Sequence, residues 1–308
     1  MSLDTSFDLK NIICLYFYDL KDIINLYDLN KDHQDNIRIT NLYDIPQKYI
    51  NRLNQQIIEQ NKYKNVEKLN AESNNKIKNV NHMKNTLKIL YCSWNSGIDQ
   101  KGISELNLIK LCASSNEKIK NVNHMKETLK ILNCGCDSGI DQNGISELNL
   151  IQLCAYGNQK IENVNHMKNT LKKLICRFGS GIDQNGISQL NLIELDANHN
   201  KKIDNVNHMK ETLKILDCGY ASGIDQNGIS QLNLIELYAT GNKKIGNVNH
   251  MKKTLKILNC DYSSGIDQNG ISELNLIELY AAHNKKITNI NHIKKYKSFV
   301  IDKSSKTN

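Results

Sequence analysis

Leucine and isoleucine recur along the chain in segments of 21 residues, with the first leucine of each segment taken as position 1. Leucine occupies position 1 from Leu87 to Leu276 and position 4 from Leu90 to Leu279, and isoleucine occupies position 12 from Ile98 to Ile287. Positions 3 to 7 alternate, which predicts a short strand with positions 4 and 6 in the core and positions 3, 5 and 7 outside. Later in each segment apolar residues stand three apart, as at Val122 and Met125, which predicts a single helical or 3₁₀ turn.

Two kinds of segment alternate, so the full repeat is 42 residues long. We call them Cys segments and Ala segments after the residue at position 6. That position holds Cys92, Cys134, Cys176, Cys218 and Cys260 in the first kind and Ala113, Ala155, Ala197, Ala239 and Ala281 in the second. Self-similarity at a fixed period indicates a solenoid, in which no segment is stable alone and neighbours bury a shared core.

The shared pattern, L-x-x-L-x-[CA]-x-x-x-x-x-I, resembles the leucine-rich repeat. The Ala segments also carry that family's asparagine at position 9, as in LIELYATGNKKI from Leu234 to Ile245. The resemblance implies an α/β fold: a leucine-rich repeat solenoid with a parallel sheet on the concave face and short helical or 3₁₀ turns on the convex face. Four of the five Cys segments lack this asparagine: position 9 is Asn95 in the first and then Asp137, Gly179, Ala221 and Ser263. We expect the fixed Ser-Gly of these segments, as at Ser138-Gly139, to bond the turn instead. A further Ala-type segment begins at Val66, which gives about eleven segments over residues 66–296.

Glycine, cysteine and histidine also recur at fixed places, and each invites a chemical interpretation. We expect the glycines that begin the return, from Gly102 to Gly270, to adopt special backbone angles. Position-6 cysteines lie two strands apart, about 10 Å, which exceeds the reach of a disulfide. The same spacing keeps the repeated histidines from sharing a metal ion. These histidines are His82, His124, His166, His208, His250 and His292. The sequence therefore predicts core cysteines and packing histidines, and no metal, cofactor or enzyme activity.

Residues 1–65 precede the segments and have a helical pattern. Apolar residues at helical spacing predict two amphipathic helices over residues 7–32 and a third over Gln47–Asn61, after the only proline. This part resembles a degenerate F-box that lacks the Leu-Pro opening and the closing aromatic residue. The resemblance implies a substrate adaptor whose residues 7–60 dock the linker of a cullin ubiquitin ligase. The alternative is an α-helical amino-terminal cap that shields the first segment.

The far end of the chain and its composition bear on location. Residues 297–308 are predicted to form a charged tail, with one last partial strand at Phe299–Ile301. The Asn/Ile/Lys-rich composition and the phrases NVNHMK and GIDQNGIS resemble the repeat proteins of giant viruses of amoebae, which would place the chain in the host cytoplasm. The sequence has no secretory apolar segment, no run of 18 apolar residues and no Asn-x-Ser/Thr acceptor. We therefore expect a cytoplasmic protein with no membrane contact.

The segments differ from one another mainly at the outward positions 5, 7 and 8. Position 8 of the Cys segments is mostly aromatic, and exposed aromatic residues and arginine dominate protein-binding sites. Position 3 changes from Lys110 to Glu278, so the carboxyl-terminal half of this face is more acidic and favours a basic partner. The candidate partner-binding residues are Trp94, Tyr156, Arg177, Phe178, Asp196, His199, Asp217, Tyr220, Tyr238, Asp261, Tyr262 and Tyr280.

Three functions are compatible with this pattern. The leading hypothesis is a monomeric, non-catalytic protein–protein interaction scaffold that binds a protein partner on the concave face. The alternative is the F-box-type adaptor, which adds a cullin-ligase linker as a second partner. A third function, nucleic-acid binding through the lysine-rich convex face, is suggested by the formal net charge of +8. We do not expect nucleic acid, because the lysine-rich stretches lack interleaved aromatic residues.

Overall fold

The computed structural model describes residues 39–45, 47–291, 293 and 298–301. The chain divides into two compact units, residues 1–148 and 149–308, which are described one at a time. The two helices predicted over residues 7–32, His292 and most of the predicted charged tail lie outside the described residues.

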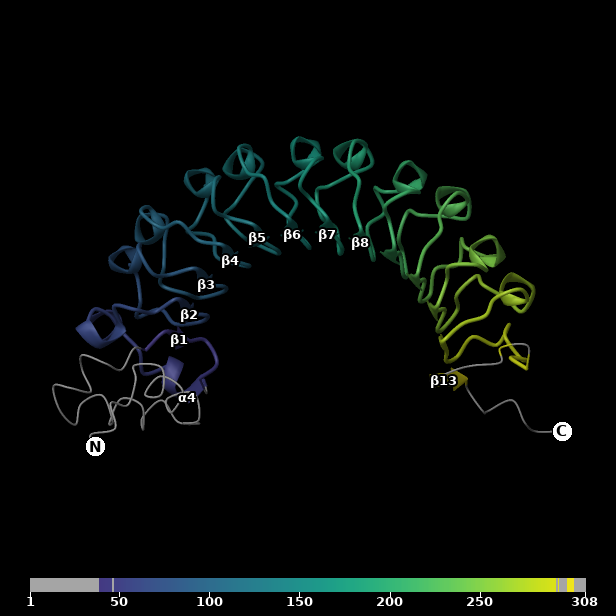
Figure 1. Ribbon diagram of the computed structural model, residues 1–308, viewed down its shortest axis with the longest axis horizontal. Helices are drawn as coiled ribbons and strands as arrows, with labels where there is room; N and C mark the ends of the chain where they lie inside the picture. The colour runs from purple at the N-terminus through teal and green to yellow at the C-terminus, as the bar shows by residue number, and fades with distance from the viewer. Residues whose placement is uncertain (1–38, 46, 292, 294–297, 302–308) are drawn as a thin grey trace, which may run out of the picture. The chain divides into compact units, whose positions relative to one another are not determined.

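In the first unit, short strands pair in parallel in the order of the chain (Figure 1). They are β1 (Asn41–Leu42), β2 (Lys68–Asn70), β3 (Ile89–Tyr91), β4 (Lys110–Cys112) and β5 (Ile131–Asn133). From β2 onward each strand occupies positions 3 to 5 of its segment, so Leu69 pairs with Leu90. β1 lies before residue 66, within the part that the sequence predicts to be helical.

The second unit repeats the same parallel arrangement. Its strands are β6 (Gln152–Cys154), β7 (Lys173–Ile175), β8 (Glu194–Asp196), β9 (Ile215–Asp217), β10 (Glu236–Tyr238), β11 (Ile257–Asn259), β12 (Glu278–Ala281) and β13 (Ser298–Ile301). β13 includes the last partial strand predicted at Phe299–Ile301 and pairs with β12.

One 3₁₀ helix follows each strand from β2 to β11, on the side of the unit away from the strands (Figure 1). In the first unit they are η2 (Asn81–Met83), η3 (Lys101–Ile103), η4 (Asn123–Met125) and η5 (Asn143–Ile145), preceded by η1 (Asn61–Tyr63). In the second they are η6 (Asn165–Met167), η7 (Asn185–Ile187), η8 (Asn207–Met209), η9 (Asn227–Ile229), η10 (Asn249–Met251) and η11 (Asn269–Ile271). The predicted repeated parallel sheet with 3₁₀ turns of a leucine-rich repeat solenoid is confirmed.

The helix predicted over Gln47–Asn61 is wrong as a single element. The structure has two one-turn helices, α4 (Gln47–Ile50) and α5 (Gln55–Ile58). Asn54 interrupts them, because its backbone is extended, with φ −144° and ψ 176°, and its side chain accepts a hydrogen bond from the Ile57 N–H. An asparagine in this conformation starts a helix rather than continuing one. Leu53 and Ile58 are buried, so this part still packs against the first unit's core.

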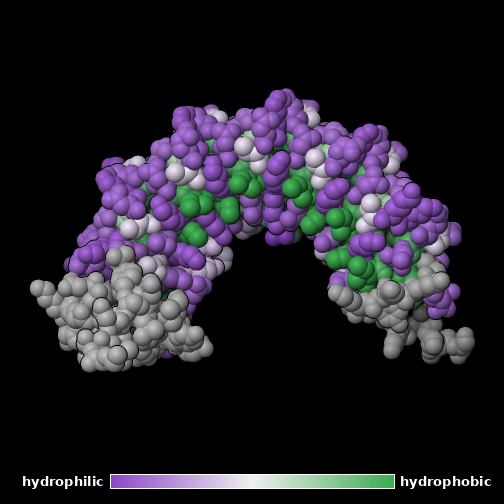
Figure 2. Space-filling model, viewed as in Figure 1, coloured by the Kyte–Doolittle hydropathy of each residue, from purple (hydrophilic) through white to green (hydrophobic). Residues whose placement is uncertain are grey.

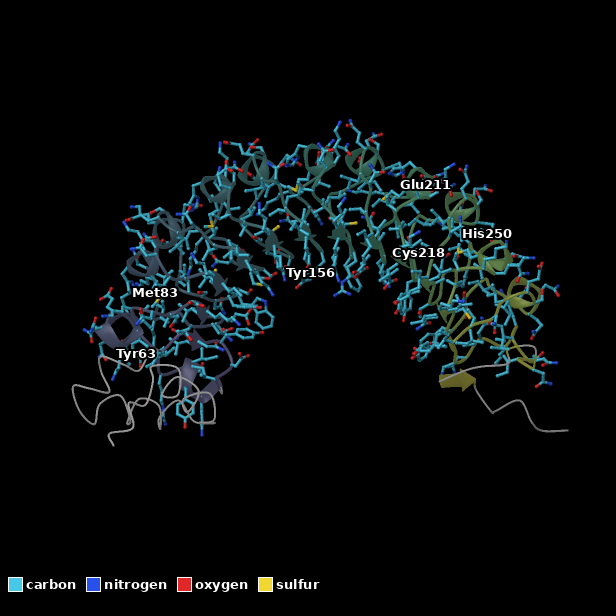
Figure 3. The ribbon with its side chains drawn as sticks, in the orientation of Figure 1. Tyr63, Met83, Tyr156, Glu211, Cys218 and His250 are labelled. Carbon is cyan, nitrogen blue, oxygen red and sulfur yellow. The ribbon has the colours of Figure 1, made fainter. Side chains whose placement is uncertain are left out.

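The core of each unit is built from the invariant positions. The leucines at positions 1 and 4 and the isoleucines at position 12 are buried, as are the cysteines and alanines at position 6. Burial raises the pKa of the Cys260 thiol to about 12, so this sulfur remains a neutral, small apolar group. Figure 3 places Tyr156 on the strand side of the second unit and His250 on the 3₁₀ side, with Cys218 between the two layers.

Asparagine at position 9 ties each Ala segment to the Cys segment before it. The buried Asn116 side chain donates from Nδ2 to the carbonyls of Cys92, at 2.8 Å, and Ile98, at 3.1 Å. Its Oδ1 accepts from the Lys118 N–H at 3.0 Å. In the Cys segment the Ser96 hydroxyl accepts from the Ile98 N–H at 3.4 Å. The expected serine bond within the turn is therefore present, but it does not reproduce the two bonds that Asn116 donates to the neighbouring segment.

The glycines that begin the return in the Cys segments do not have the special backbone angles predicted from the sequence. Among the described glycines only Gly157, Gly179 and Gly241 have positive φ. A Cβ on Gly102 would instead lie 2.1 Å from the Lys78 carbonyl oxygen, and one on Gly186 would lie 2.0 Å from that of Glu162. Glycine is required here because the backbone of the preceding segment passes too close for any side chain.

The repeated histidines bond to backbone. His124, His208 and His250 place Nε2 3.1 Å from the carbonyl oxygen of an isoleucine in the preceding segment. Nε2 must carry the proton for this contact, and desolvation lowers the pKa of His124 and His208. The predicted packing role is confirmed for these histidines.

Candidate protein-binding surface

Every described segment adopts a left-handed backbone at position 8, with φ between 51° and 65°. We call these residues the position-8 row. It comprises Ser73, Trp94, Ser115 and Cys136 in the first unit and Gly157, Phe178, His199, Tyr220, Gly241, Tyr262 and His283 in the second. Such a backbone costs a residue other than glycine about 1–2 kcal/mol. Bulky rings at this place therefore need a compensating interaction or a functional reason.

Stacking compensates part of that cost in the second unit. The His199 ring lies between the rings of Phe178, at 5.0 Å and 20°, and Tyr220, at 4.9 Å and 10°. Tyr262 and His283 form a second, tilted pair at 5.5 Å. Such pairs contribute about 0.5–1.5 kcal/mol beyond the area they bury. Phe178, Tyr220 and Tyr262 remain 44–54% exposed, so the row presents apolar ring faces to solvent.

Arg177 contacts both the position-8 row, through Phe178, and a residue of strand β8, Asp196. Its guanidinium carbon lies 5.7 Å from the Tyr156 ring centre and 5.4 Å from that of Phe178. Its Nη1 is 3.4 Å from Oδ2 of Asp196, whereas its buried Nε has no hydrogen-bond partner among the described residues. The structure thus brings Tyr156, Arg177, Phe178 and Asp196 into one cluster.

A second carboxylate, that of Asp217, lies beside the Asp196 of this cluster. Asp196 and Asp217 are paired residues of β8 and β9, and desolvation and the charge of Asp217 raise the pKa of Asp196. Asn198 donates from Nδ2 to Asp217 at 3.0 Å, but its own buried Oδ1 has no hydrogen-bond partner among the described residues. The two adjacent carboxylates raise the negative charge beside Arg177, and a further cation would be stabilised there.

Replacing Asp196 by asparagine is expected to stabilise the protein at neutral pH by about 0.5–1 kcal/mol, a small effect because the charge is partly screened. Ionised Asp196 opposes folding, since its folded pKa is raised above the ordinary value of 3.8. That penalty is complete above the folded pKa and fades as the pH falls toward the ordinary value. Urea denaturation from pH 7 to pH 4 should show the gap between variant and wild type narrowing. A gap that widens on acidification would contradict the assignment.

The remaining predicted residues of this face are bound into local contacts. Tyr238 donates to Glu236 at 2.8 Å and Tyr280 donates to Glu278 at 3.0 Å. Burial, with the Glu236 contact, raises the pKa of Tyr238 to about 12. Asp261 accepts from the Ala282 N–H at 2.6 Å. These residues form an acidic, tyrosine-bearing part of the strand face, apart from the stacked group of Phe178, His199 and Tyr220.

Sequence reasoning missed a row of exposed isoleucines at position 2 of the Ala segments. They are 40–49% exposed and comprise Ile109, Ile151, Ile193, Ile235 and Ile277. The signal was present in the sequence as an isoleucine every 42 residues. Figure 2 shows hydrophobic surface recurring among hydrophilic surface within each unit.

The repeated lysines of the 3₁₀ side are largely paired. Lys84 lies 2.6 Å from Glu105, Lys126 lies 2.7 Å from Glu147, and Lys252 pairs with Glu273. Lys168 donates to Gln189 at 3.0 Å. The three exposed pairs with glutamate add little stability, and each offsets one positive charge on this side.

Within the described ranges, no group of three or more His, Cys, Asp or Glu side chains could hold a metal ion. In the same part of the chain, no helix has the length and apolar character needed to cross a membrane.

No family model matches the chain, and no curated protein matches it in sequence. Among solved structures, it is similar to the functional domain of InlJ from Listeria monocytogenes, which includes a cysteine ladder, with 19% identity and a TM-score of 0.42 over 71% of this chain. The match spans 64% of that InlJ chain. The yeast Rad7–Elc1 complex matches at 13% identity, with a TM-score of 0.36 over 90% of this chain and 92% of that chain. The complex of TLR13 with ssRNA13 matches at 15% identity, with a TM-score of 0.43 over 82% of this chain and 36% of that chain.

Proposed function

We propose that this chain is a non-catalytic interaction protein that binds a basic protein partner on the strand face of its second unit. The observation that carries the proposal is the Asp196–Asp217 pair beside the stacked rings of Phe178, His199 and Tyr220. Exposed rings supply apolar area at a low cost in side-chain entropy, and they cluster at the centres of protein interfaces.

The charges on this face select the partner. From β8 to β12 the outward positions carry Glu194, Asp196, Asp217, Glu236, Asp261 and Glu278. A partner's arginine or lysine would pair with the carboxylates of Asp196 and Asp217. Neutralising this pair also removes the repulsion that raises the pKa of Asp196.

The test is affinity capture from the native cell, followed by measurement of the dissociation constant for the captured partner. The double variant Asp196→Asn/Asp217→Asn should weaken binding at least tenfold, and adding Tyr220→Ala should abolish it. The matched control is Glu105→Gln/Glu147→Gln, which removes two carboxylates from the 3₁₀ side and should leave binding unchanged. Equal binding by wild type and the aspartate variant would reject the proposed face.

The adaptor role remains a prediction, because most of the F-box-like part lies outside the described residues. Deletion of residues 1–38 should leave capture by the second unit intact under the proposal above. Recovery of a ligase linker by the intact chain, and its loss on deletion, would support the adaptor role as an addition.

A further inference from the structure

Among the described residues, Trp94 differs from the other rings of the position-8 row because neither of its row neighbours is aromatic. Its backbone is left-handed, with φ 63°, and its row neighbours are Ser73 and Ser115. The indole is 61% exposed and, among the described residues, stacks on no other ring. The left-handed backbone is common to the whole row, so what distinguishes Trp94 is a large ring face left open to solvent.

The indole forms one wall of an open pocket of about 550 Å³ in the first unit. The other residues that line the pocket include Asn51, Glu72, Ser73, Asn75 and Lys76. Asn51 follows α4, and the residues from Glu72 to Lys76 form the loop after β2.

Hydrogen bonds fix the frame of this pocket. Buried Asn74, beneath it, donates to the carbonyls of Ile50, at 2.8 Å, and Leu53, at 3.0 Å. Lys76 donates from Nζ to the Asn51 carbonyl at 3.0 Å. The turn after α4 is thereby held against the loop after β2, so the pocket exists before any ligand binds.

Three polar side chains remain available at the pocket surface. Glu72, Ser73 and Asn75 offer a carboxylate, a hydroxyl and a carboxamide, none of which has a side-chain hydrogen bond within the described part of the chain. Together they provide both donors and acceptors beside an indole face. The lining carries one negative and one positive charge, at Glu72 and Lys76, so it has no net preference for an ion.

We propose that this pocket binds a neutral carbohydrate. A sugar ring has a C–H face that packs flat on an indole and a rim of hydroxyls that each donate and accept, which matches Trp94 beside Glu72, Ser73 and Asn75. An apolar peptide side chain would cover the indole but would make no hydrogen bond with Glu72, Ser73 or Asn75. A nucleotide would bring its phosphate charge next to the Glu72 carboxylate, and Lys76 is already engaged by Asn51.

Trp94 is the only tryptophan of the chain, so its fluorescence reports on this pocket alone. The full chain is titrated with maltotriose, cellotriose, mannotriose and chitotriose, and a saturable shift of emission is expected with at least one, at a dissociation constant on the order of 1 mM. Glu72→Gln and Asn75→Ala should each weaken that response at least fivefold. Glu67→Gln makes the same chemical change outside the pocket and should not alter it.

Adenosine monophosphate and N-acetylphenylalaninamide are titrated as competing ligand classes. A saturable shift of emission with either compound, without a shift with any trisaccharide, would overturn the carbohydrate assignment. The absence of a shift with every compound tested would overturn it as well. Unchanged urea denaturation midpoints establish that each variant is folded. Capture of the protein partner by Glu72→Gln should equal that of wild type, so failure here and failure of the proposed function can be told apart.

Discussion

Replacing Gly186 by alanine is expected to destabilise the second unit by about 3 kcal/mol or more. The new Cβ would lie 2.0 Å from the carbonyl oxygen of Glu162, an atom held in the backbone of the neighbouring segment. Gly186 itself donates from its N–H to Asp183 at 2.8 Å, and its carbonyl accepts from the Val164 N–H at 3.0 Å. Relief of the overlap must therefore separate the segments or break these bonds.

The matched control is Gly179→Ala, seven residues earlier in the same segment. Gly179 has φ +72°, but a Cβ there would meet no atom within 4 Å. The expected cost is only the left-handed penalty of about 1–2 kcal/mol. Urea denaturation of both variants measures the difference. If Gly186→Ala loses no more stability than Gly179→Ala, the close approach of the two backbones is not the constraint on Gly186.

Replacing Asn200 by alanine is expected to cost about 3–5 kcal/mol, since three buried backbone groups lose their partner together. Asn200 donates to the carbonyls of Cys176, at 2.8 Å, and Ile182, at 3.0 Å, and accepts from the Lys202 N–H at 2.9 Å. The side chain is 1% exposed, so bulk water does not replace these bonds.

Two further variants test the role of Asn200. Ser180→Ala, in the preceding Cys segment, removes one long bond from the Ile182 N–H, at 3.4 Å, and should cost about 0.5–1.5 kcal/mol. Asn200→Asp keeps the acceptor but loses both donated bonds when ionised, so its stability should recover partly at acid pH, where the protonated acid can donate again. Equal losses for Asn200→Ala and Ser180→Ala in denaturation experiments would contradict the proposed role of the asparagine.

The fold could be predicted in detail because the repeat fixes which residues share a face. The burial of Leu174 and Ile182 could be predicted from their positions in the repeat alone. Glycine was harder: Gly186 and Gly179 look alike in a sequence, yet one is required by the backbone of a neighbouring segment and the other has positive φ. The two cases can be distinguished only when the distance between the backbones of neighbouring segments is known. The break at Asn54 was missed because its side chain fits a helix start as well as a polar helix face.

The candidate surface could be predicted as a set of variable positions but not as contacts. Aromatic residues at position 8 gave no sign of a left-handed backbone, which usually favours glycine. The stack of Phe178, His199 and Tyr220, and the reach of Arg177 to Tyr156, depend on side-chain directions across neighbouring segments. The exposed isoleucines at position 2 were not predicted, because a binding surface was expected only at positions that differ between segments.

The bonds of Asn200 have a consequence for how such a chain can change its length. The asparagine of an Ala segment bonds to the Cys segment before it, as Asn200 does to Cys176. In the Cys segment, the Gln159 carbonyl passes so close to Gly181 that its oxygen would lie 2.5 Å from a Cβ added to that glycine. The Ala segments carry lysine in place of that glycine, as at Lys202. Loss of a single Cys segment, or duplication of a single Ala segment, would therefore set a lysine against a carbonyl, whereas a gain or loss of 42 residues leaves every junction as it was. Unequal recombination in the coding sequence can thus alter the number of surface positions without unfolding the protein, provided that it acts on whole pairs.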